Sequence, residues 1–374
     1  MTKTLEDLCS LIDQFFPFSI QEDWDNSGLQ IGNLKERLKN LAVCLDVNTG
    51  VIEFAYKKGA NLIISHHPLL FNSVKKIDFS SSYGKILKEL IVKKISVISL
   101  HTNLDKCLRT CFSLVNDLWI KKCRPIVQKD LTNKYKLAVF VPSGYVEEVK
   151  DAVFSVINRY SLNYTDVSFS SKGVGTFTPS KEANPFKGNY GARELVNEER
   201  IEFLVDLEKL SEVINAVYKV HPYEEPAFDV YPLKNESLSS AFGFGLFGDV
   251  EIKGLSLKEV ENILKEKLNI KTLRKVGSSV KEVKSIAICP GSGASLLEDV
   301  AKIAPSIYIT GDLKYHDAQK AEELNLTVYD VGHFSMENLL MRDFSIYLQG
   351  IFNKNNYDSN IYFFDRSKDF FINC

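Results

Sequence analysis

The sequence predicts an α/β protein made of two repeated α/β halves, with an α+β domain inserted between them. Short apolar runs alternate with amphipathic segments in residues 40–105, and the same order returns in residues 285–340. Between these segments the pattern changes to fewer, longer elements and a loop rich in glycine and proline. The predicted domains are residues 1–128, 129–234 and 235–374, of which the first and the last form one core.

The first half begins with an amphipathic helix. Apolar residues of MTKTLEDLCSLIDQFF (1–16) recur at helical spacing, which is not the pattern of a signal peptide. Strands and helices then alternate, which favours a largely parallel sheet covered by helices. The predicted strands are 41–47 (LAVCLDV), 61–68 (NLIISHHP) and 95–105 (ISVISLHTNLD), and the predicted helices are 50–60 and 83–94.

The second half repeats this order after the insert. Its predicted strands are 285–291 (SIAICPG), 306–312 (SIYITGD) and 326–337 (LTVYDVGHFSME), and its helices are 293–304 and 315–324. The third strands correspond, because one ends in His101-x-x-x-Asp105 and the other in His333-x-x-x-Glu337. Each half therefore delivers a histidine and, four residues later, a carboxylate.

The insert is predicted as an α+β sandwich. A strand and a helix come first, a Gly- and Pro-rich loop follows, and a strand, a helix and a further strand complete the domain. The predicted elements are strand 135–142, helix 145–160, loop 173–191, strand 199–207, helix 208–220 and the loop 221–233 that leads into the last strand.

Composition excludes several classes of protein. The chain has 374 residues, 45% hydrophobic and 25% charged, with a formal net charge of −2. These values are typical of a globular protein, and they predict neither a broad nucleic-acid-binding surface nor a membrane partner. No apolar run approaches membrane-spanning length. Seven cysteines without a CxxC pair predict reduced thiols and a cytoplasmic location.

The histidines carry the chemical signal. Of the six in the chain, His221 lies in the insert, where we expect a structural role. The other five follow predicted strands of the two halves, where α/β proteins place their active sites. Mixed imidazole and carboxylate ligands suit Zn, Fe or Mn better than Ca or Mg. Such a number of ligands favours two ions over one.

Several stretches together resemble one family. They are WDNSGLQIG (24–32), ISHHPLLF (64–71), LHTNLD (100–105), TGDLKYHDA (310–318) and VGHFSMEN (331–338). In this order they resemble the Nif-three-like (YbgI/YqfO) family, whose members carry the name GTP cyclohydrolase 1 type 2 homologue. Residues 173–191 and 221–233 resemble the long-form members, which implies an insert of the PII/CutA type, ferredoxin-like in fold.

The resemblance implies a dinuclear metal site and an assembly. Its ligands would be His66, His67, Asp105, His333 and Glu337, with two divalent ions (Zn, Fe or Mn) per chain. It also implies a homohexameric ring with the sites around its cavity. Glu337 is the favoured bridging ligand, because a carboxylate can give one oxygen to each ion.

Other polar residues could orient water or contact a substrate. These candidates are His101, Asp312, Tyr315 and His316, and the loop with Asp25, Asn26 and Gly28 is expected near the cleft. Asp312 could instead cap the following helix. The turn CPGSGAS (289–295) could hold a phosphate, although a tight turn needs glycine in any case.

Two functions remain open from the sequence. One is metal-dependent hydrolysis of a small molecule or nucleotide, in the manner of a GTP cyclohydrolase. GxSxG and P-loop motifs are absent, so neither a serine nucleophile nor ordinary GTPase chemistry is indicated. The other is a non-catalytic metal-binding or regulatory protein whose PII-like insert senses a ligand. No residue is predicted to bind an organic cofactor, and no catalytic residue is assigned.

Overall fold

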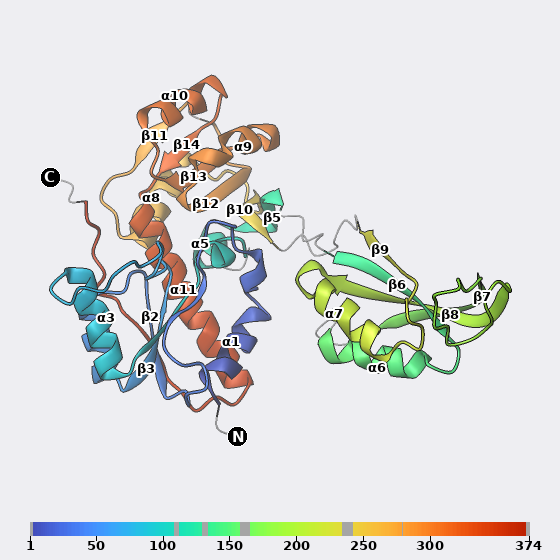
Figure 1. The fold of residues 1–374 in the computed structure, drawn as a ribbon. Coiled ribbons are helices and arrows are strands. Elements are labelled where there is room, and N and C mark those ends of the chain that lie inside the picture. The colour runs from blue at the N-terminus through green and yellow to red at the C-terminus, as the bar shows by residue number, and fades with distance from the viewer. Residues whose placement is uncertain are drawn as a thin grey trace. The chain divides into compact units, whose positions relative to one another are not determined.

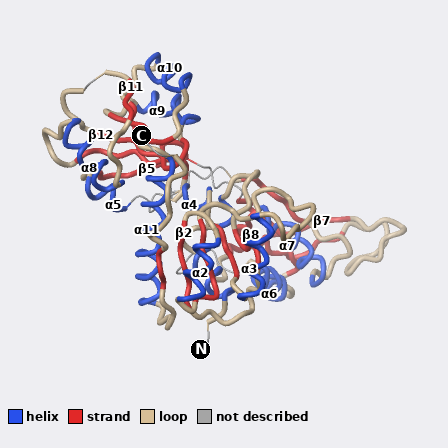
Figure 2. The backbone as a smooth tube through the Cα atoms, turned by 90° about the vertical axis from the view of Figure 1, so that its left-hand side faces the viewer, coloured by secondary structure: helices blue, strands red, loops and turns tan. Residues whose placement is uncertain are grey.

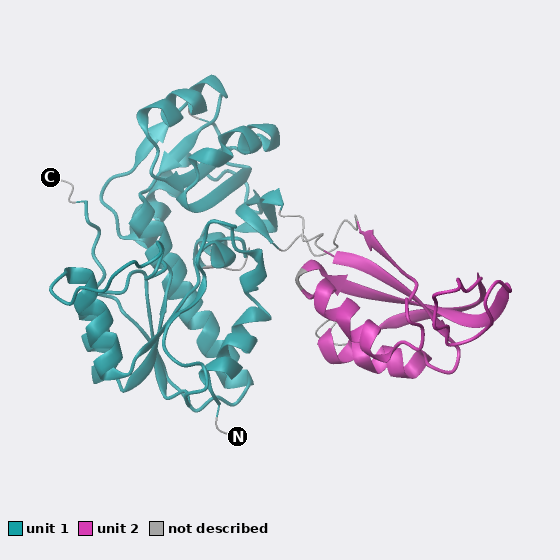
Figure 3. Ribbon diagram, in the orientation of Figure 1, with its two compact units in different colours: residues 1–129, 239–374 teal, residues 130–238 magenta. Residues whose placement is uncertain are grey.

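The computed structural model describes residues 3–107, 112–128, 134–157, 165–233, 242–278 and 280–371. The chain divides into two compact units, which Figure 3 distinguishes by colour. Residues 1–129 and 239–374 form one unit, called the core below, and residues 130–238 form the other, called the insert. The borders predicted from the sequence were 128/129 and 234/235.

The first core sheet contains the strands of the first half and one strand from the C-terminus. Its elements are β1 (Gly28–Ile31), β2 (Asn40–Cys44), α2 (Thr49–Lys57), β3 (Ala60–Ser65), α3 (Ser82–Lys93), β4 (Ser96–Ser99) and β15 (Ile361–Phe363). The strand order is β1-β4-β3-β2-β15. All neighbours are parallel except β1, which pairs antiparallel with β4.

The second core sheet contains the strands of the second half and β5, the last strand of the first half. Its elements are β5 (Ile120–Gln128), β10 (Gly243–Val250), β11 (Arg274–Val276), β12 (Ser285–Ser292), the 3-10 helix η3 (Ala294–Leu296), α9 (Leu297–Ile303), β13 (Ile307–Gly311), α10 (Tyr315–Glu323) and β14 (Val328–Asp330). The strand order is β11-β14-β13-β12-β10-β5.

The two sheets share one topology over their central strands. β12, β13 and β14 are parallel and in sequence order, as β2, β3 and β4 are in the first sheet. The correspondence extends to the edge, because β11 pairs antiparallel with β14 as β1 does with β4. The mixed α/β fold class predicted from the sequence is confirmed.

Apolar residues cover both faces of the second sheet, which explains its continuous apolar strands. Along β12, Ile286 and Ile288 belong to one buried cluster. Ala287 and Cys289, which alternate with them, belong to the cluster on the opposite face. Because successive side chains of a strand point to opposite faces, a strand covered on both sides must be apolar throughout.

The remaining core helices include one that contacts both sheets. They are α1 (Leu5–Asp13), the 3-10 helix η1 (Phe18–Ile20), α4 (Thr102–Asp105), α5 (Phe112–Asp117), α8 (Leu257–Leu268) and α11 (His333–Lys354). α11 contacts β2 and β15 of the first sheet and β12 and β13 of the second. Figures 1 and 2 show it running alongside β2. α11 therefore lies where the two core sheets meet.

Helix starts follow the local sequence. Asn48 accepts a hydrogen bond from the N–H of Val51 at the start of α2, and Ser81 accepts one from Gly84 at the start of α3. Such caps satisfy backbone donors that have no partner inside the helix. In the described part of the chain no helix is both long and apolar enough to span a membrane.

The insert forms a sheet of its own. Its elements are β6 (Lys134–Pro142), α6 (Val146–Val156), β7 (Ser168–Phe177), β8 (Glu194–Asp206), α7 (Leu207–Val220) and β9 (Phe228–Pro232). The strand order is β7-β8-β6-β9 and every neighbouring pair is antiparallel. A βαββαβ chain with this order has the ferredoxin-like topology. The end of the predicted helix 145–160 lies outside the described residues.

One prediction for the insert was wrong. The glycine-rich segment starting at Gly173 was predicted as loop, but Gly173 and Gly175 belong to β7 and pair with Glu198 and Val196 of β8. A Cβ atom on Gly175 would lie 2.2 Å from Oε2 of Glu198. Glycine within a strand often marks a close approach of this kind, and by sequence alone it is indistinguishable from a loop glycine.

Candidate metal centre

The histidine pair follows the end of β3. Its last residue, Ser65, has its Oγ 2.9 Å from Oγ of Ser99 on β4. The backbone N–H groups of His66 and His67 both donate to the carbonyl oxygen of Leu45, each at 3.1 Å, and this fixes the turn across the end of β2. His66 is fully buried, and His67 is partly exposed. The pair thus lies at the carboxyl end of the parallel strands, as predicted.

The two His-x-x-x-carboxylate segments are helical. The predicted third strands were too long, because β4 ends at Ser99 and β14 at Asp330. His101 is the N-cap of α4, which ends at Asp105, and His333 is the first residue of α11. Residues four apart in a helix are neighbours on one face, so this spacing brings imidazole and carboxylate together. In a strand the same two residues would also share a face but lie about 13 Å apart.

Glu337 lies at the centre of the cluster. Its side chain is only 4% exposed, and its Oε1 is 3.6 Å from Nε2 of His66. Its Oε2 is 3.0 Å from Nε2 of His67 and 2.8 Å from Nε2 of His333. Oδ1 of Asp105 is 3.4 Å from Nε2 of His66. The structure therefore brings the five predicted ligands together from both halves of the core.

Each imidazole of the cluster has its Nδ1 held by an acceptor. His66 Nδ1 lies 2.8 Å from the carbonyl oxygen of Leu100, which can only accept a hydrogen bond. The carboxylates that hold the other rings are Asp46 for His67 at 2.8 Å, Asp25 for His101 at 2.8 Å and Asp312 for His333 at 2.9 Å. Placing the proton on Nδ1 leaves the Nε2 lone pair free, the usual state of a metal-binding histidine.

The polar atoms of the cluster fit a metal ion. Among the described residues, His66 Nε2 and Asp105 Oδ1 are buried and have no hydrogen-bond partner. Ligands at about 2.0–2.1 Å from a tetrahedral ion lie ~3.4 Å apart, close to the 3.4 and 3.6 Å that separate His66 Nε2 from Asp105 and Glu337. Ring nitrogens of His66, His67 and His101 lie within 4.8 Å of one another, and so do ligand atoms of His67, His333 and Glu337.

The carboxylates of the cluster favour a positive charge on or between the imidazoles that face them. Burial lowers the pKa of His67, but hydrogen bonds with Asp46 and Glu337 outweigh it and raise that pKa to about 10. The hydrogen bond with Glu337 raises the pKa of His333 to about 9. Burial raises the pKa of Glu337, yet the facing His66 and His333 hold it well below its usual range. Protons on the imidazoles or a bound divalent cation can supply this positive charge.

Comparison with known proteins agrees with the motifs. The family model described as Duf34/NIF3 (NGG1p interacting factor 3) matches residues 3–369. The chain belongs to this family. It is 34% identical over 362 residues to a Bacillus subtilis protein named GTP cyclohydrolase 1 type 2 homolog, covering 96% of this chain and 95% of the relative.

Solved structures show the same relationship over the full length. A Bacillus cereus protein related to NIF3 is 31% identical, with a TM-score of 0.76 and 100% of both chains covered. Staphylococcus aureus protein SA1388 is 29% identical, with a TM-score of 0.78, covering 100% of this chain and 99% of that one. The resemblance drawn from the motifs is therefore confirmed for the family.

Among the additional candidates of this NIF3-family chain, two residues join the cluster. His101 faces His66 and His67, with ring centroids 5.2 and 5.8 Å away. Asp312 accepts from His333 and so orients that ring. It does not cap the following helix, since Lys314 is the N-cap of α10 and Asp317 completes the capping box.

Tyr315 and His316 lie outside the cluster. Their rings pack against each other with centroids 5.4 Å apart, and both side chains are exposed. Within the described residues no hydrogen bond or ion pair joins either side chain to the clustered histidines. A role of Tyr315 and His316 in orienting water or substrate stays a prediction.

Two features of the site were missed in the sequence. Asp46 holds His67, but in the sequence it lay inside the predicted strand 41–47 and gave no separate signal. Gly291 has φ +64°, and a Cβ there would lie 2.3 Å from Oε1 of Glu337. The turn CPGSGAS thus makes room for Glu337. The N–H of Gly293 already donates to Thr310 Oγ1 at 2.9 Å, which argues against a phosphate cradle.

Proposed function

We propose that the centre holds two divalent metal ions per chain and that the protein is a metal-dependent hydrolase. The observation that carries the dinuclear proposal is the carboxylate of Glu337. Its Oε1 faces His66, which also faces Asp105, and its Oε2 faces His67 and His333. Oε1 is thus available to an ion held by His66 and Asp105, and Oε2 to an ion held by His67 and His333, as in a bridging carboxylate.

The chemistry of the ligands restricts which metals the site can bind well. Three imidazoles and two carboxylates suit Zn, Fe or Mn, because Ca and Mg prefer shells of oxygen. When bound, such ions lower the pKa of a coordinated water and polarise a substrate oxygen or ring carbon. Asp46 and Asp312 would keep His67 and His333 in the tautomer that ligation needs.

His101 is the residue we propose for proton transfer. Asp25 holds its Nδ1, so Nε2 is the atom that can take or give a proton beside His66 and His67. Thr102 fixes the second oxygen of Asp25 by two hydrogen bonds. Its N–H donates at 3.0 Å, and its hydroxyl donates to the same oxygen. The hydrogen bonds from His101 and Thr102 outweigh burial and lower the pKa of Asp25, which keeps it an anion.

A planar substrate fits the surroundings of His101. Trp24 and Phe71 are 60% and 49% exposed. Their ring centroids lie 6.0 and 6.4 Å from that of His101 and 6.1 Å from each other. Exposed aromatic rings beside a polar centre offer a stacking surface for a heterocycle. This supports a nucleotide base as the substrate class, in line with the name of the Bacillus subtilis relative.

The reaction to test is hydrolytic opening of an imidazole ring. Two waters would be consumed, and the carbon between the two ring nitrogens would leave as formate. Of the four water hydrogens, two would go to the unsubstituted ring nitrogen, one to the nitrogen that bears the ribose, and one would be released as a proton. The experiment incubates the metal-loaded protein with GTP and measures formate. Release above that of the metal-stripped protein supports the hydrolase, and His101→Gln should lower it while metal content stays unchanged. No formate under metal-replete conditions would refute this substrate, and metal loss in His101→Gln would make His101 a ligand.

The second candidate function is a non-catalytic metal-binding or regulatory protein. The ferredoxin-like topology of the insert favours it, because this topology is compatible with the PII/CutA-like sensing domain that we propose for residues 129–234. Metal content that is stable while no hydrolysis occurs on a panel of nucleotides would support this alternative.

We also propose a homohexameric ring in the cytoplasm. The described cysteines are free thiols, which supports a reducing compartment. The ring follows from the family resemblance, and light scattering of the full-length protein is its test. A mass six times that of the chain is the expected result.

A further inference from the structure

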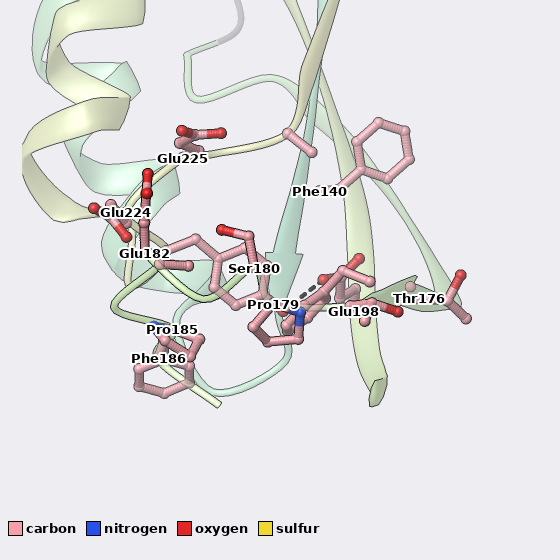
Figure 4. Close-up of a pocket in the computed structure, with 16 residues that line it drawn as sticks. Phe140, Thr176, Pro179, Ser180, Glu182, Pro185, Phe186, Glu198, Glu224 and Glu225 are labelled. Atoms are coloured by element: carbon pink, nitrogen blue, oxygen red, sulfur yellow. Dashed lines mark hydrogen bonds between the residues drawn. The ribbon is translucent and has the colours of Figure 1, made fainter. Parts of the chain in front are cut away.

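The insert contains a cavity of about 780 Å³. Its walls come from β6, β7, β8, the loop after β7 and the loop before β9. Figure 4 shows the residues that line it. A volume of this size is in the range of small-molecule sites. None of the proposed metal ligands lies in the insert, so the cavity and the metal centre have no residue in common.

The cavity is acidic. Among the residues that line it are four glutamates, and none of these lining residues is Lys, Arg or His. In Figure 4, Glu182, Glu224 and Glu225 lie on one side of the pocket and Glu198 on the other. Carboxylates of one sign around a partly enclosed space favour a cation within it.

Glu198 is the buried member of this set. It is 8% exposed, and its Oε1 accepts a hydrogen bond from the hydroxyl of Tyr223 at 2.6 Å. Gly175 leaves the room that its Oε2 occupies. Among the described residues no Lys or Arg forms an ion pair with Glu198. A buried carboxylate without a counter-charge is costly, and a bound cation would remove that cost.

Aromatic rings complete the walls. The ring centroid of Tyr223 lies 5.7 Å from that of Phe177 and 6.1 Å from that of Phe186. His221 fixes Tyr223 in place. Its Nδ1 accepts from the N–H of Tyr223 at 3.1 Å, and its Nε2 donates to the carbonyl oxygen of Phe140 at 3.0 Å. Aromatic faces attract both the apolar body of a ligand and an ammonium group.

We propose that this cavity binds a small organic cation, with its ammonium group beside Glu198 and its apolar body against Tyr223, Phe177 and Phe186. The cavity is far larger than a bare metal ion, and its aromatic walls offer such an ion no ligand. The cation–aromatic arrangement distinguishes this site from the imidazole-rich metal centre.

Three probes of similar shape test the proposal by calorimetry on the full-length protein. They are 2-phenylethylammonium, the neutral 2-phenylethanol and the anionic phenylacetate. The cation should bind at least about tenfold more tightly than the alcohol, and the anion should not bind. Equal affinity for cation and alcohol, tighter binding of the anion, or no binding of the cation would overturn the proposal.

Variants locate the binding. Glu198→Gln should weaken 2-phenylethylammonium at least about tenfold while leaving 2-phenylethanol unchanged. Glu147→Gln is the matched control, because this insert glutamate is outside the cavity and its side chain is 80% exposed. Unchanged affinity in folded Glu198→Gln would refute the proposed site. If circular dichroism shows that Glu198→Gln is unfolded, Phe186→Ala decides, because this ring is 48% exposed and the proposal places the apolar body of the ligand against it. Unaltered affinity for 2-phenylethylammonium in Phe186→Ala would then refute the proposed site.

Discussion

Gly291 of β12 lies directly against the carboxylate of Glu337 of α11 at the candidate metal centre. A Cβ atom at position 291 would lie 2.3 Å from Oε1 of Glu337, and the φ of Gly291 is +64°. The glycine therefore serves the carboxylate in two ways, by leaving room and by adopting a backbone conformation that other residues avoid.

Gly291→Ala should displace Glu337 and lower metal content. The left-handed backbone alone costs roughly 1–2 kcal/mol with a side chain present, so the melting temperature should fall as well. Gly350→Ala is the control, because a Cβ there meets no atom within 4 Å and its position in α11 favours alanine. Elemental analysis and thermal unfolding provide the measurements. Full metal content in Gly291→Ala would show that Glu337 does not need its present position.

Glu337→Gln and His333→Ala should differ in the number of ions that they lose. The two oxygens of Glu337 face different histidines, so Gln should disturb both proposed ions, whereas removing His333 affects the group at Oε2 alone. Elemental analysis after purification without chelator should give close to two equivalents for the wild type and close to one for His333→Ala. Retention of both ions in Glu337→Gln would refute the bridging role. Light scattering should give both variants the wild-type mass.

Removal of the insert should leave the metal centre intact. β5 and β10, which flank it in the sequence, are antiparallel neighbours, and Gln128 pairs with Gly243. A short Gly/Ser linker can therefore join them as a hairpin would. The expected result is a folded core with the metal content of the full chain. A folded core without metal would mean that the insert helps to build the site.

The pH dependence of the insert should depend on His221. Burial lowers the pKa of this histidine, so it is neutral in the folded protein at pH 7. The unfolded chain binds its proton near pH 6.5, which means that stability is fully present above this value and is lost as the pH falls below it. Protonation of Nδ1 would also break the hydrogen bond from Tyr223.

Amide hydrogen exchange is the measurement for this effect. Between about pH 7 and about pH 5, protection of residues 221–227 should fall in the wild type, after correction for the intrinsic exchange rate. His221→Gln should remove this fall, and the exposed His316→Gln should not. A wild-type profile that is flat over this range would contradict the assignment.

The sequence predicted those parts of the molecule whose signals are local. The apolar runs that became β2, β3, β12 and β13, and the histidine pair after β3, could be recognised without knowing what packs against them. Gly175 could not be interpreted, because its reason is the side chain of Glu198 on a neighbouring strand. Asp46 was missed for the same cause, since its partner His67 follows the end of a neighbouring strand, β3. The helical start at His333 was also hidden, because its packing depends on Gly311 in β13, where a Cβ would lie 2.7 Å from the N–H nitrogen of His333.

The pairing of β15 with β2 has a consequence for the order of folding during synthesis. A ribosome releases β2 early, yet the strand at its side is Ile361–Phe363, which follows every strand of the second sheet in the sequence. β5 must likewise wait for β10, which is made only after the whole insert. The strands of the insert, by contrast, all lie between Lys134 and Pro232 and are complete while the core still lacks half of its chain. In a growing polypeptide the inserted domain can therefore fold first, and the core that surrounds it in the sequence finishes last.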